Sequence, residues 1–468
     1  MCLYKKSLLC AFAVLLSGCN LSETITDYTA STLCSKLFLA ELPKKHILKT
    51  DLIPTTVGLV GSVYKKIDYQ SKTVTASFSG AKSKAIYLDN LGCTVVGDVS
   101  EGELRQRSVT DVESAYLDPD SPWPYGSAGI DRATGDDESD IDVSIISQAA
   151  DKLFIEDQLF AKNTASVLVS YKDKLIFERY ADQYQPSTPM PMFSISKTVS
   201  ALLSGILTEQ GLMDVHKPVN LDKWMSPVDP RHRITPHHLM SMTAGIGNKE
   251  KVDDIDPDLF DLLIADDRVE EFSSMASFAE PGSQYHYNTG NYLIQSKIIQ
   301  NSIGGDMSDY YAYIQNELFR KIGINSAVVQ TDNSGNMDLG MFAFMNARDM
   351  ARFGLLLKNE GRWQDKQVVA KEWIDYMRKP SGLLTPWNTD YGVGIFPNTA
   401  IAGNRFWPSL PKDAMTAIGF RGQFIVIVPS LDLVIVRLGH GTSEDGILAQ
   451  VGKFIEQVPK ALVNHIDI

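Results

Sequence analysis

The chain contains a serine and a lysine at a spacing that allows one to activate the other, in Ser194-Ile195-Ser196-Lys197. Serine is a weak nucleophile until a base takes its proton. On a helix, a lysine three positions later lies on the same face as the serine, and burial can leave its amine partly neutral and able to accept that proton. A Ser-x-x-Lys at a helix start therefore indicates nucleophilic acyl transfer.

The same spacing occurs at Ser62–Lys65 and at Ser79–Lys82. Both lie in β-like stretches, in which residues i and i+3 point to opposite faces. Only Ser194 opens a proline-free segment whose apolar residues fall at helical spacing, and this segment has a plausible stop at Gly211. A helix start also places backbone N–H groups near the reacting centre. We therefore expect the chemistry at Ser194.

A second candidate lies downstream, in the polar segment Pro281–Tyr292. A loop tyrosine can relay a proton between lysine, serine and a leaving group. The segment offers Tyr285 and Tyr287, which face the same way because they are two residues apart. Taken alone, a tyrosine in such a loop is more often structural.

The third candidate is Ala417–Gln423, which precedes a strand-like run. Its glycines would let a substrate approach the strand edge, and backbone N–H groups near Gly419 and Phe420 could help to form an oxyanion hole.

Together and in this order, the three segments resemble those of serine β-lactamase-related hydrolases: class C β-lactamases, penicillin-binding-protein-like DD-peptidases, related esterases and 6-aminohexanoate-dimer hydrolases. Ile234–Ile246, Ala347–Gly354 and Gly419–Pro429 support the resemblance, which covers about residues 145–455. It implies an α/β (α+β) class of the β-lactamase/transpeptidase type, with an antiparallel sheet flanked by helices and an all-helical subdomain.

The resemblance also implies a role for each candidate residue. Ser194 would be the nucleophile and Lys197 the general base. The proton relay of the family is six residues after the proline of Pro-Gly, which is Tyr287 here. The N–H of Ser194 and one near Gly419-Phe420 would form the oxyanion hole, and the reaction would pass through an acyl-enzyme without a cofactor.

Two departures from the β-lactamase pattern affect the expected substrate. That pattern has Tyr-x-Asn, whereas Tyr287 is followed by Asn288 and Thr289. It also has Lys-Thr-Gly on the closing strand, whose nearest alignment here is Ala414–Ala417. The absent lysine removes a charge that would meet a substrate carboxylate. We therefore expect a small-molecule or peptide-like ester or amide substrate rather than efficient penicillin hydrolysis. The alternative is a non-hydrolytic cell-wall or β-lactam binding protein that uses the same pocket.

Other functions have less support in the sequence. It contains no Gly-x-Ser-x-Gly, no His-Glu-x-x-His and no cysteine spacing typical of zinc. We expect no metal site: His237-His238 is interpreted as packing, and the acidic run 136–142 as a solvated linker before a helix rather than a calcium loop. The formal net charge of -13 argues against nucleic acid as a partner.

The amino terminus predicts export and lipidation. Lys5 and Lys6 precede the apolar run Leu8–Leu16, which is too short for a membrane span of ~20 residues. Leu16-Ser17-Gly18-Cys19 resembles the lipobox of bacterial lipoproteins, which implies a lipid on Cys19 and a bilayer as partner. By the same resemblance, Asn20 favours the outer membrane. We expect a protein of the bacterial cell envelope that faces the periplasm or the cell exterior.

The remaining cysteines agree with this location. Two cysteines leave with the signal peptide and Cys19 takes the lipid, so that Cys34 and Cys93 remain as one pair. An exported protein permits a disulfide between them. Two buried free thiols are the alternative.

The elements that must position the candidates are predicted from periodicity and turn residues. We expect strands at 55–60, 73–78, 85–88, 423–428 and 433–438, a hairpin from 166–171 and 174–180 turned at Lys172-Asp173, a loop at 118–126, and helices at 194–210, 310–322 and 347–358. The predicted domains are a signal peptide (1–18), a tether (19–40), a small β-rich accessory region with linker (41–142) and the hydrolase domain (143–468).

Overall fold

The computed structural model describes residues 21–52, 62–107, 109, 112–130, 140–155, 163–247, 262–441 and 444–462. The chain divides into two compact units. Unit 1 takes in the chain up to Ser108 together with the segments Glu250–Glu271 and Gln330–Asn336. Unit 2 comprises Val109–Lys249, Phe272–Val329 and Met337–Ile468.

Unit 1 is built on a four-stranded antiparallel sheet in the order β1-β2-β3-β4. Its strands are β1 Tyr64–Asp68, β2 Thr73–Phe78, β3 Ala81–Leu88 and β4 Gly92–Val95. Its helical elements are residues 21–34, the π-helical turn η1 Ser35–Leu39, α2 Lys44–Thr50 and α3 Glu101–Leu104. A disulfide joins Cys34 to Cys93 of β4, with Cα atoms 6.1 Å apart. This region is the predicted β-rich N-terminal part.

Two predicted boundaries differ from the structure. The expected tether, 19–40, is helical over residues 21–39 and contributes fully buried side chains such as Leu33 to unit 1. Its apolar side chains Ile25, Ala30 and Leu33 are buried, so the segment is part of the core and not a tether. The accessory region was predicted as 41–142, but unit 1 ends at Ser108 and recruits two distant segments, which a linear pattern cannot reveal.

Unit 2 contains a six-stranded antiparallel sheet in the order β14-β15-β16-β17-β7-β8. Its strands are β7 Thr164–Tyr171, β8 Lys174–Tyr180, β14 Phe396–Pro397, β15 Met415–Gly419, β16 Gln423–Val428 and β17 Leu433–Gly439. The predicted hairpin of β7 and β8 is present, and Lys172 and Asp173 at its turn have φ values of 48° and 60°. Both values lie in the region that a two-residue hairpin turn of type I′ requires. Strands from both ends of unit 2 thus pair at its centre.

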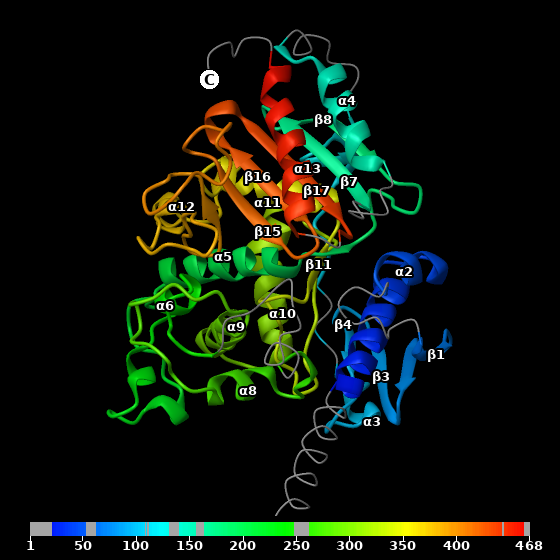
Figure 1. Ribbon diagram of the computed structural model, residues 1–468, viewed down its shortest axis with the longest axis vertical. Coiled ribbons are helices and arrows are strands. Elements are labelled where there is room, and N and C mark those ends of the chain that lie inside the picture. The colour runs from blue at the N-terminus through cyan, green and yellow to red at the C-terminus, as the bar shows by residue number, and fades with distance from the viewer. Residues whose placement is uncertain are drawn as a thin grey trace, which may run out of the picture. The chain divides into compact units, whose positions relative to one another are not determined.

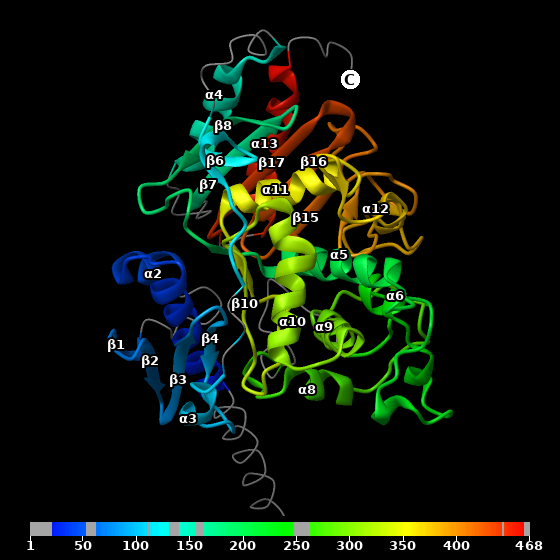
Figure 2. The same cartoon turned by 180° about the vertical axis from the view of Figure 1, so that it is seen from behind.

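Helices cover both faces of this sheet (Figures 1 and 2). On one face, α4 Val143–Phe154 and α13 Glu444–Gln457 pack over side chains such as Val426 and Ile435. On the other face lies α11 Ala347–Lys358, whose Gly354 comes so close to Ile425 and Val434 that a Cβ would overlap them. Successive strand residues therefore face opposite layers, which explains why every residue of β16 and β17 is buried.

The rest of unit 2 is mostly helical. Its longer helices are α5 Ser196–Glu209, α6 Pro236–Met240, α8 Arg268–Ser274 (of which the first turn belongs to unit 1), α9 Gly290–Ile303, α10 Met307–Ile314 and α12 Lys371–Arg378. Short strands complete it: β5 Asp118–Pro122, β6 Gly126–Ala128, β9 Met190–Pro191, β10 Val328–Val329, β11 Ala343–Met345, β12 Arg362–Trp363 and β13 Lys366–Gln367. Helix α9 contacts α5, α6 and α10. The predicted fold class, a mixed α/β fold with an antiparallel sheet and a helical subdomain, is confirmed.

Three local predictions have other outcomes. The loop predicted at 118–126 contains the parallel pair β5–β6. The helix predicted at 310–322 begins at Met307, because Asp306 caps it, and continues as the π-helical turn η7 Gln315–Phe319 and the 3₁₀ turn η8 Arg320–Ile322. The strand predicted at 55–60 lies outside the described residues. Among the helices of the described segments, none has the length and apolar character needed to span a bilayer.

Candidate active site

Ser194 lies at the start of the predicted helix. It occupies the 3₁₀ turn η4 Phe193–Ile195, directly before α5, and its side chain is half-buried. Phe193 has a φ of 47°, a left-handed conformation that costs a non-glycine residue about 1–3 kcal/mol. This strained conformation is located at the residue directly before Ser194, at the start of the helix.

Lys197 is buried beneath Ser194, with 1% of its surface exposed. Its Nζ lies 3.0 Å from the Ser194 Oγ, 3.2 Å from the Thr289 Oγ1 and 2.8 Å from the Gly340 carbonyl oxygen. Burial disfavours the charged form of a lysine amine. The pair therefore lies at a distance that allows proton transfer from the serine, and the amine is removed from solvent.

The carbonyl that accepts from Lys197 is itself held in place. The buried Asp338 carboxylate accepts hydrogen bonds from the N–H groups of Gly340, at 2.9 Å, and Met341, at 2.8 Å. These bonds fix the turn that presents the Gly340 carbonyl. A backbone carbonyl has no side-chain signature, so this contact could not be predicted from the sequence.

Tyr287 lies next to Lys197, a contact that the sequence alone could not establish. Its ring centroid lies 5.1 Å from the Lys197 Nζ. Tyr287 is half-buried and lies in the loop before α9. Both tyrosines lie edge to face with Tyr391, Tyr285 with centroids 5.5 Å apart and Tyr287 with centroids 6.3 Å apart. The geometry thus favours Tyr287 among the two tyrosines that the motif offers.

Two further tyrosines surround the site. Tyr292 lies 6.0 Å from the Lys197 Nζ, measured to its ring centroid, and donates its hydroxyl to the Met240 carbonyl. Burial raises the pKa of the Tyr292 phenol and that of Tyr391 above the ordinary value. Both therefore remain neutral donors near physiological pH.

Strand β15 ends beside the nucleophile. A Cβ on Gly419 would lie 2.2 Å from the carbonyl oxygen of Met192, two residues before Ser194, so that only a glycine allows this approach. The next residue, Phe420, is 40% exposed and its ring lies edge to face with that of Phe193, 5.6 Å away. This edge is where the second oxyanion donor was predicted.

The two departures from the β-lactamase pattern have structural counterparts. Thr289 takes the position of the asparagine in Tyr-x-Asn, and its hydroxyl accepts from Lys197. Strand β15 has the sequence Met-Thr-Ala-Ile-Gly and carries no charged side chain.

The structure therefore brings together Ser194, Lys197, Tyr287, Gly419 and Phe420, all within unit 2. Sequence reasoning missed Thr289, Gly340 and Asp338 as their partners. Of these, only Thr289 had a signal, its place two residues after Tyr287. The arrangement is suited to acyl transfer, because a nucleophile, a buried amine and a strand edge converge on one point.

The other Ser-x-x-Lys segments are not built this way. Ser62 is exposed, and the amine of Lys65 donates to the Val63 carbonyl. Ser79 lies in the β2–β3 turn with a φ of 49°, while Lys82 lies on β3.

His237 is packed among aromatic side chains. Its ring lies 5.4 Å from that of His216 and 5.9 Å from that of His238, and its Nδ1 is hydrogen-bonded to the Tyr376 hydroxyl. Burial, with smaller contributions from neighbouring positive charges, lowers the pKa of His237 to about 4. Within the described segments, no three His, Cys, Asp or Glu side chains are grouped so as to hold a metal ion.

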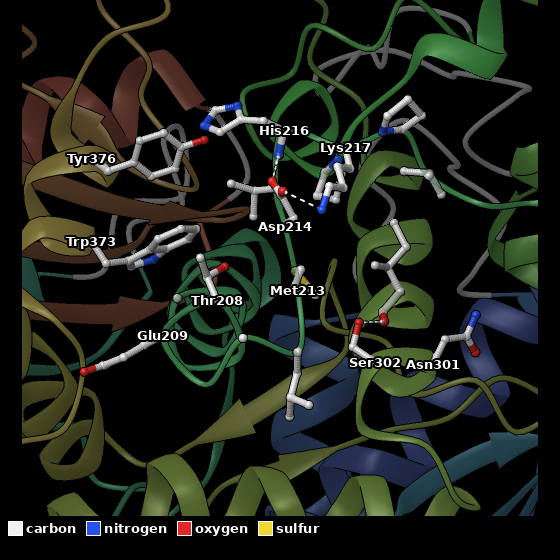
Figure 3. Close-up of a pocket in the computed structure, with 18 of the residues that line it drawn as sticks. Thr208, Glu209, Met213, Asp214, His216, Lys217, Asn301, Ser302, Trp373 and Tyr376 are labelled. Atoms are coloured by element: carbon white, nitrogen blue, oxygen red, sulfur yellow. Dashed lines mark hydrogen bonds and ion pairs between the residues drawn. The ribbon is translucent and has the colours of Figure 1, made fainter.

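A cavity of about 990 Å³ lies at the C-terminal end of α5 (Figure 3), whereas Ser194 precedes the N-terminal end of this helix. Thr208 and Glu209 of α5, Asp214, Trp373 and Tyr376 line it. A helix of 14 residues is about 21 Å long, so this cavity is separate from the predicted catalytic residues. The predicted lipidation residue, Cys19, lies outside the described residues.

Comparisons with known proteins agree with this fold. The chain is 22% identical over 335 residues to the 6-aminohexanoate-dimer hydrolase of Paenarthrobacter ureafaciens, covering 65% of this chain and 82% of that protein. Its fold is similar to that of a Bacillus anthracis protein assigned as a 6-aminohexanoate-dimer hydrolase (TM-score 0.54, 20% identity, 64% of this chain and 81% of that one). It is also similar to a penicillin-binding protein homologue from Caulobacter crescentus (TM-score 0.54, 14% identity, 68% and 97%).

The family and the name of the curated relative support a hydrolase of this fold. The family model described as Beta-lactamase matches residues 155–456, well over half of the chain and the part that holds the site. The chain belongs to the beta-lactamase family.

Proposed function

We propose that this protein is a serine hydrolase that cleaves an ester or amide bond through an acyl-enzyme. The observation that carries the proposal is the pairing of the half-buried Ser194 Oγ with the buried Lys197 Nζ at 3.0 Å. The relatives named as 6-aminohexanoate-dimer hydrolases, whose names denote amide cleavage, support it.

In the proposed mechanism, the Ser194 Oγ attacks the substrate carbonyl carbon while its proton passes to the Lys197 Nζ. Backbone N–H groups of Ser194 and at Gly419-Phe420 stabilise the oxyanion. Tyr287 delivers a proton to the leaving group as the carbonyl–leaving-group bond breaks, which leaves an acyl-Ser194 ester. Water then attacks this ester, and the same Tyr-Lys pair takes the water proton and returns one to Ser194.

The contacts of Lys197 support its role as base. Thr289 and the Gly340 carbonyl hold the amine in place while Ser194 remains within hydrogen-bonding distance. A base that is already positioned avoids the entropic cost of finding its partner during the reaction.

We further propose that the protein works in the bacterial cell envelope, anchored by a lipid on Cys19. The segment Lys5–Cys19, with its charged start, apolar run and lipobox-like end, supports this location. A disulfide between Cys34 and Cys93 is compatible with an oxidising compartment.

The test is a hydrolysis screen on the purified protein with p-nitrophenyl esters, aminohexanoate dimer, D-Ala-D-Ala peptides and nitrocefin. We expect Ser194→Ala to lose about 10³-fold or more in kcat and Lys197→Ala nearly as much, because residues that act as one unit are not additive. Both variants should keep the wild-type circular dichroism spectrum. Activity of Ser194→Ala within tenfold of wild type would refute the proposal.

The rival function is a binding protein that is acylated once and does not turn over. The progress curve separates the two: repeated turnover supports the hydrolase, whereas release of one equivalent of p-nitrophenol per Ser194, with no further product, supports the receptor. Intact mass of the arrested protein would show the retained acyl group.

A further inference from the structure

Two aromatic side chains next to the catalytic residues are exposed. Trp387 is 44% exposed and lies edge to face with Tyr287, with centroids 6.2 Å apart. Phe420 is 40% exposed and makes the corresponding contact with Phe193, the neighbour of Ser194. Two separate segments thus each place an apolar ring beside the site. Trp387 lies against Tyr287, and Phe420 lies against the residue that precedes Ser194.

These rings are supported by their surroundings. Trp387 also lies edge to face with Phe396 of β14, at 6.0 Å, and Phe396 packs on Tyr391 at 4.8 Å. A ring that is already fixed loses little entropy when a ligand covers it. Exposed apolar surface that is held rigid at a site is typical of recognition.

The two arginines near this edge of the sheet are hydrogen-bonded to other groups of the protein. Arg421, which follows Phe420, is 7% exposed, and its guanidinium donates to the carbonyls of His440 and Gly441. Arg437 is buried and donates to the Gly422 carbonyl and the Thr164 hydroxyl. In the described turn after β15, the Arg421 guanidinium thus points to backbone carbonyls. A substrate carboxylate would lack a partner there.

We infer that the substrate carries an uncharged, apolar acyl group, which lies against Trp387 and Phe420 beside the scissile bond. This inference rests on the proposed hydrolase function and deepens it. It assigns to Trp387 and Phe420 the selection of the acyl chain, and it excludes acyl chains that carry an anionic group.

The experiment is a chain-length series of p-nitrophenyl esters from acetate to octanoate, with the p-nitrophenyl hemi-ester of glutaric acid as the charged counterpart of the valerate. We expect kcat/KM to rise roughly two- to fourfold per methylene as far as the hexanoate, and the valerate to exceed the glutarate by tenfold or more. Trp387→Ala and Phe420→Ala should flatten the gradient, and Phe420→Leu should retain part of it.

Tyr125→Ala is the matched control. Tyr125 is 43% exposed and lies edge to face with Trp363, at 5.5 Å, so it has the same exposure and the same type of contact away from the catalytic residues. Tyr125→Ala should leave the increase of kcat/KM with acyl chain length unchanged. A flat gradient, a preference for acetate or glutarate, or an equal loss in Tyr125→Ala would overturn the inference, even if hydrolysis depends on Ser194.

A binding measurement separates this inference from the hydrolase proposal. Ligand-observed NMR with hexanamide and acetamide requires no turnover. If no ester is hydrolysed but hexanamide binds more tightly than acetamide, and Trp387→Ala and Phe420→Ala abolish the difference, the apolar subsite stands and the hydrolase proposal fails. If neither amide binds in a way that depends on these rings and hydrolysis is also absent, both fail.

Discussion

At the scale of the residue, burial of the amine next to a specific partner distinguishes the three Ser-x-x-Lys pairs. Burial lowers the pKa of Lys65 below its ordinary value, as it would for any lysine partly removed from water. Yet the Lys65 amine donates to the Val63 carbonyl, and Ser62 is exposed to solvent. A perturbed lysine is therefore not evidence of catalysis by itself; the serine hydroxyl must also lie within its reach, as it does at Lys197.

The hydroxyl of Tyr287 is the next feature to test at this scale. Tyr287→Phe keeps the ring that lies against Lys197 and removes only the proton carrier. We expect a loss of roughly 10²–10⁴ in kcat. Amide substrates should lose more than p-nitrophenyl esters, because an amine leaving group needs a proton and p-nitrophenolate does not.

Tyr285→Phe is the control for this prediction, since Tyr285 lies in the same loop and shares the contact with Tyr391. It should change both substrates little. A larger, amide-selective loss in Tyr285→Phe would assign the relay to Tyr285 and leave the Ser-Lys pair unaffected.

At the scale of the element, helix α5 begins beside the proposed Ser194–Lys197 pair and packs against α12 at Ala201 and Gly205. Gly205 of α5 lies against the indole of Trp373 on α12: a Cβ there would be 2.4 Å from its Cδ1 atom. The indole Nε1 donates to the Ala201 carbonyl, one turn earlier on α5. Gly205 thus allows the close approach that holds the Ser194 helix against its neighbour.

This approach predicts the outcome of Gly205→Ala. Alanine gains about 1 kcal/mol in helix propensity over glycine, but overpacking a buried contact costs about 1–3 kcal/mol. We expect the overpacking to prevail, because the nearest atoms belong to a rigid indole. The urea midpoint followed by tryptophan fluorescence should fall.

Thr208→Ala on the same helix serves for comparison, since Thr208 is only half-buried and its hydroxyl bonds to the Ser204 carbonyl within α5. It should change the free energy of unfolding by about 0.5 kcal/mol or less. If Gly205→Ala is as stable as Thr208→Ala, the α5–α12 contact is not as tight as the geometry indicates.

At the scale of the whole molecule, the two units differ in how they are stabilised. Unit 2 has a three-layer core around its six-stranded sheet. Unit 1 has a smaller sheet and a disulfide that closes a separation of 59 residues. Such a cross-link contributes about 4 kcal/mol in the chain-entropy model.

Mass spectrometry of the mature protein tests the assignment of the cysteines. We expect a chain that begins at a lipidated Cys19, and no alkylation of Cys34 or Cys93 until a reductant is added. Reduction should lower the thermal stability of unit 1. An amino terminus upstream of Cys19 would contradict the lipoprotein assignment, and two thiols that react without reduction would contradict the disulfide.

The sequence by itself determined the elements whose patterns are local. The helix after Ser194, the hairpin at Lys172-Asp173 and the strand Gln423–Val428 follow from periodicity and turn residues within a few positions. The Ser194–Lys197 pair could be predicted for the same reason, because residues three positions apart lie on the same face of a helical turn.

Only the tertiary structure decided what joins these elements. The Gly340 carbonyl is 143 residues from Lys197 and has no side chain to mark it. The exposure of Trp387 and Phe420 depends on packing between distant segments, and unit 1 recruits Gln330–Asn336 from far along the chain. Such contacts are selected by the burial of surface that exists only once the chain has folded, so no local pattern specifies them.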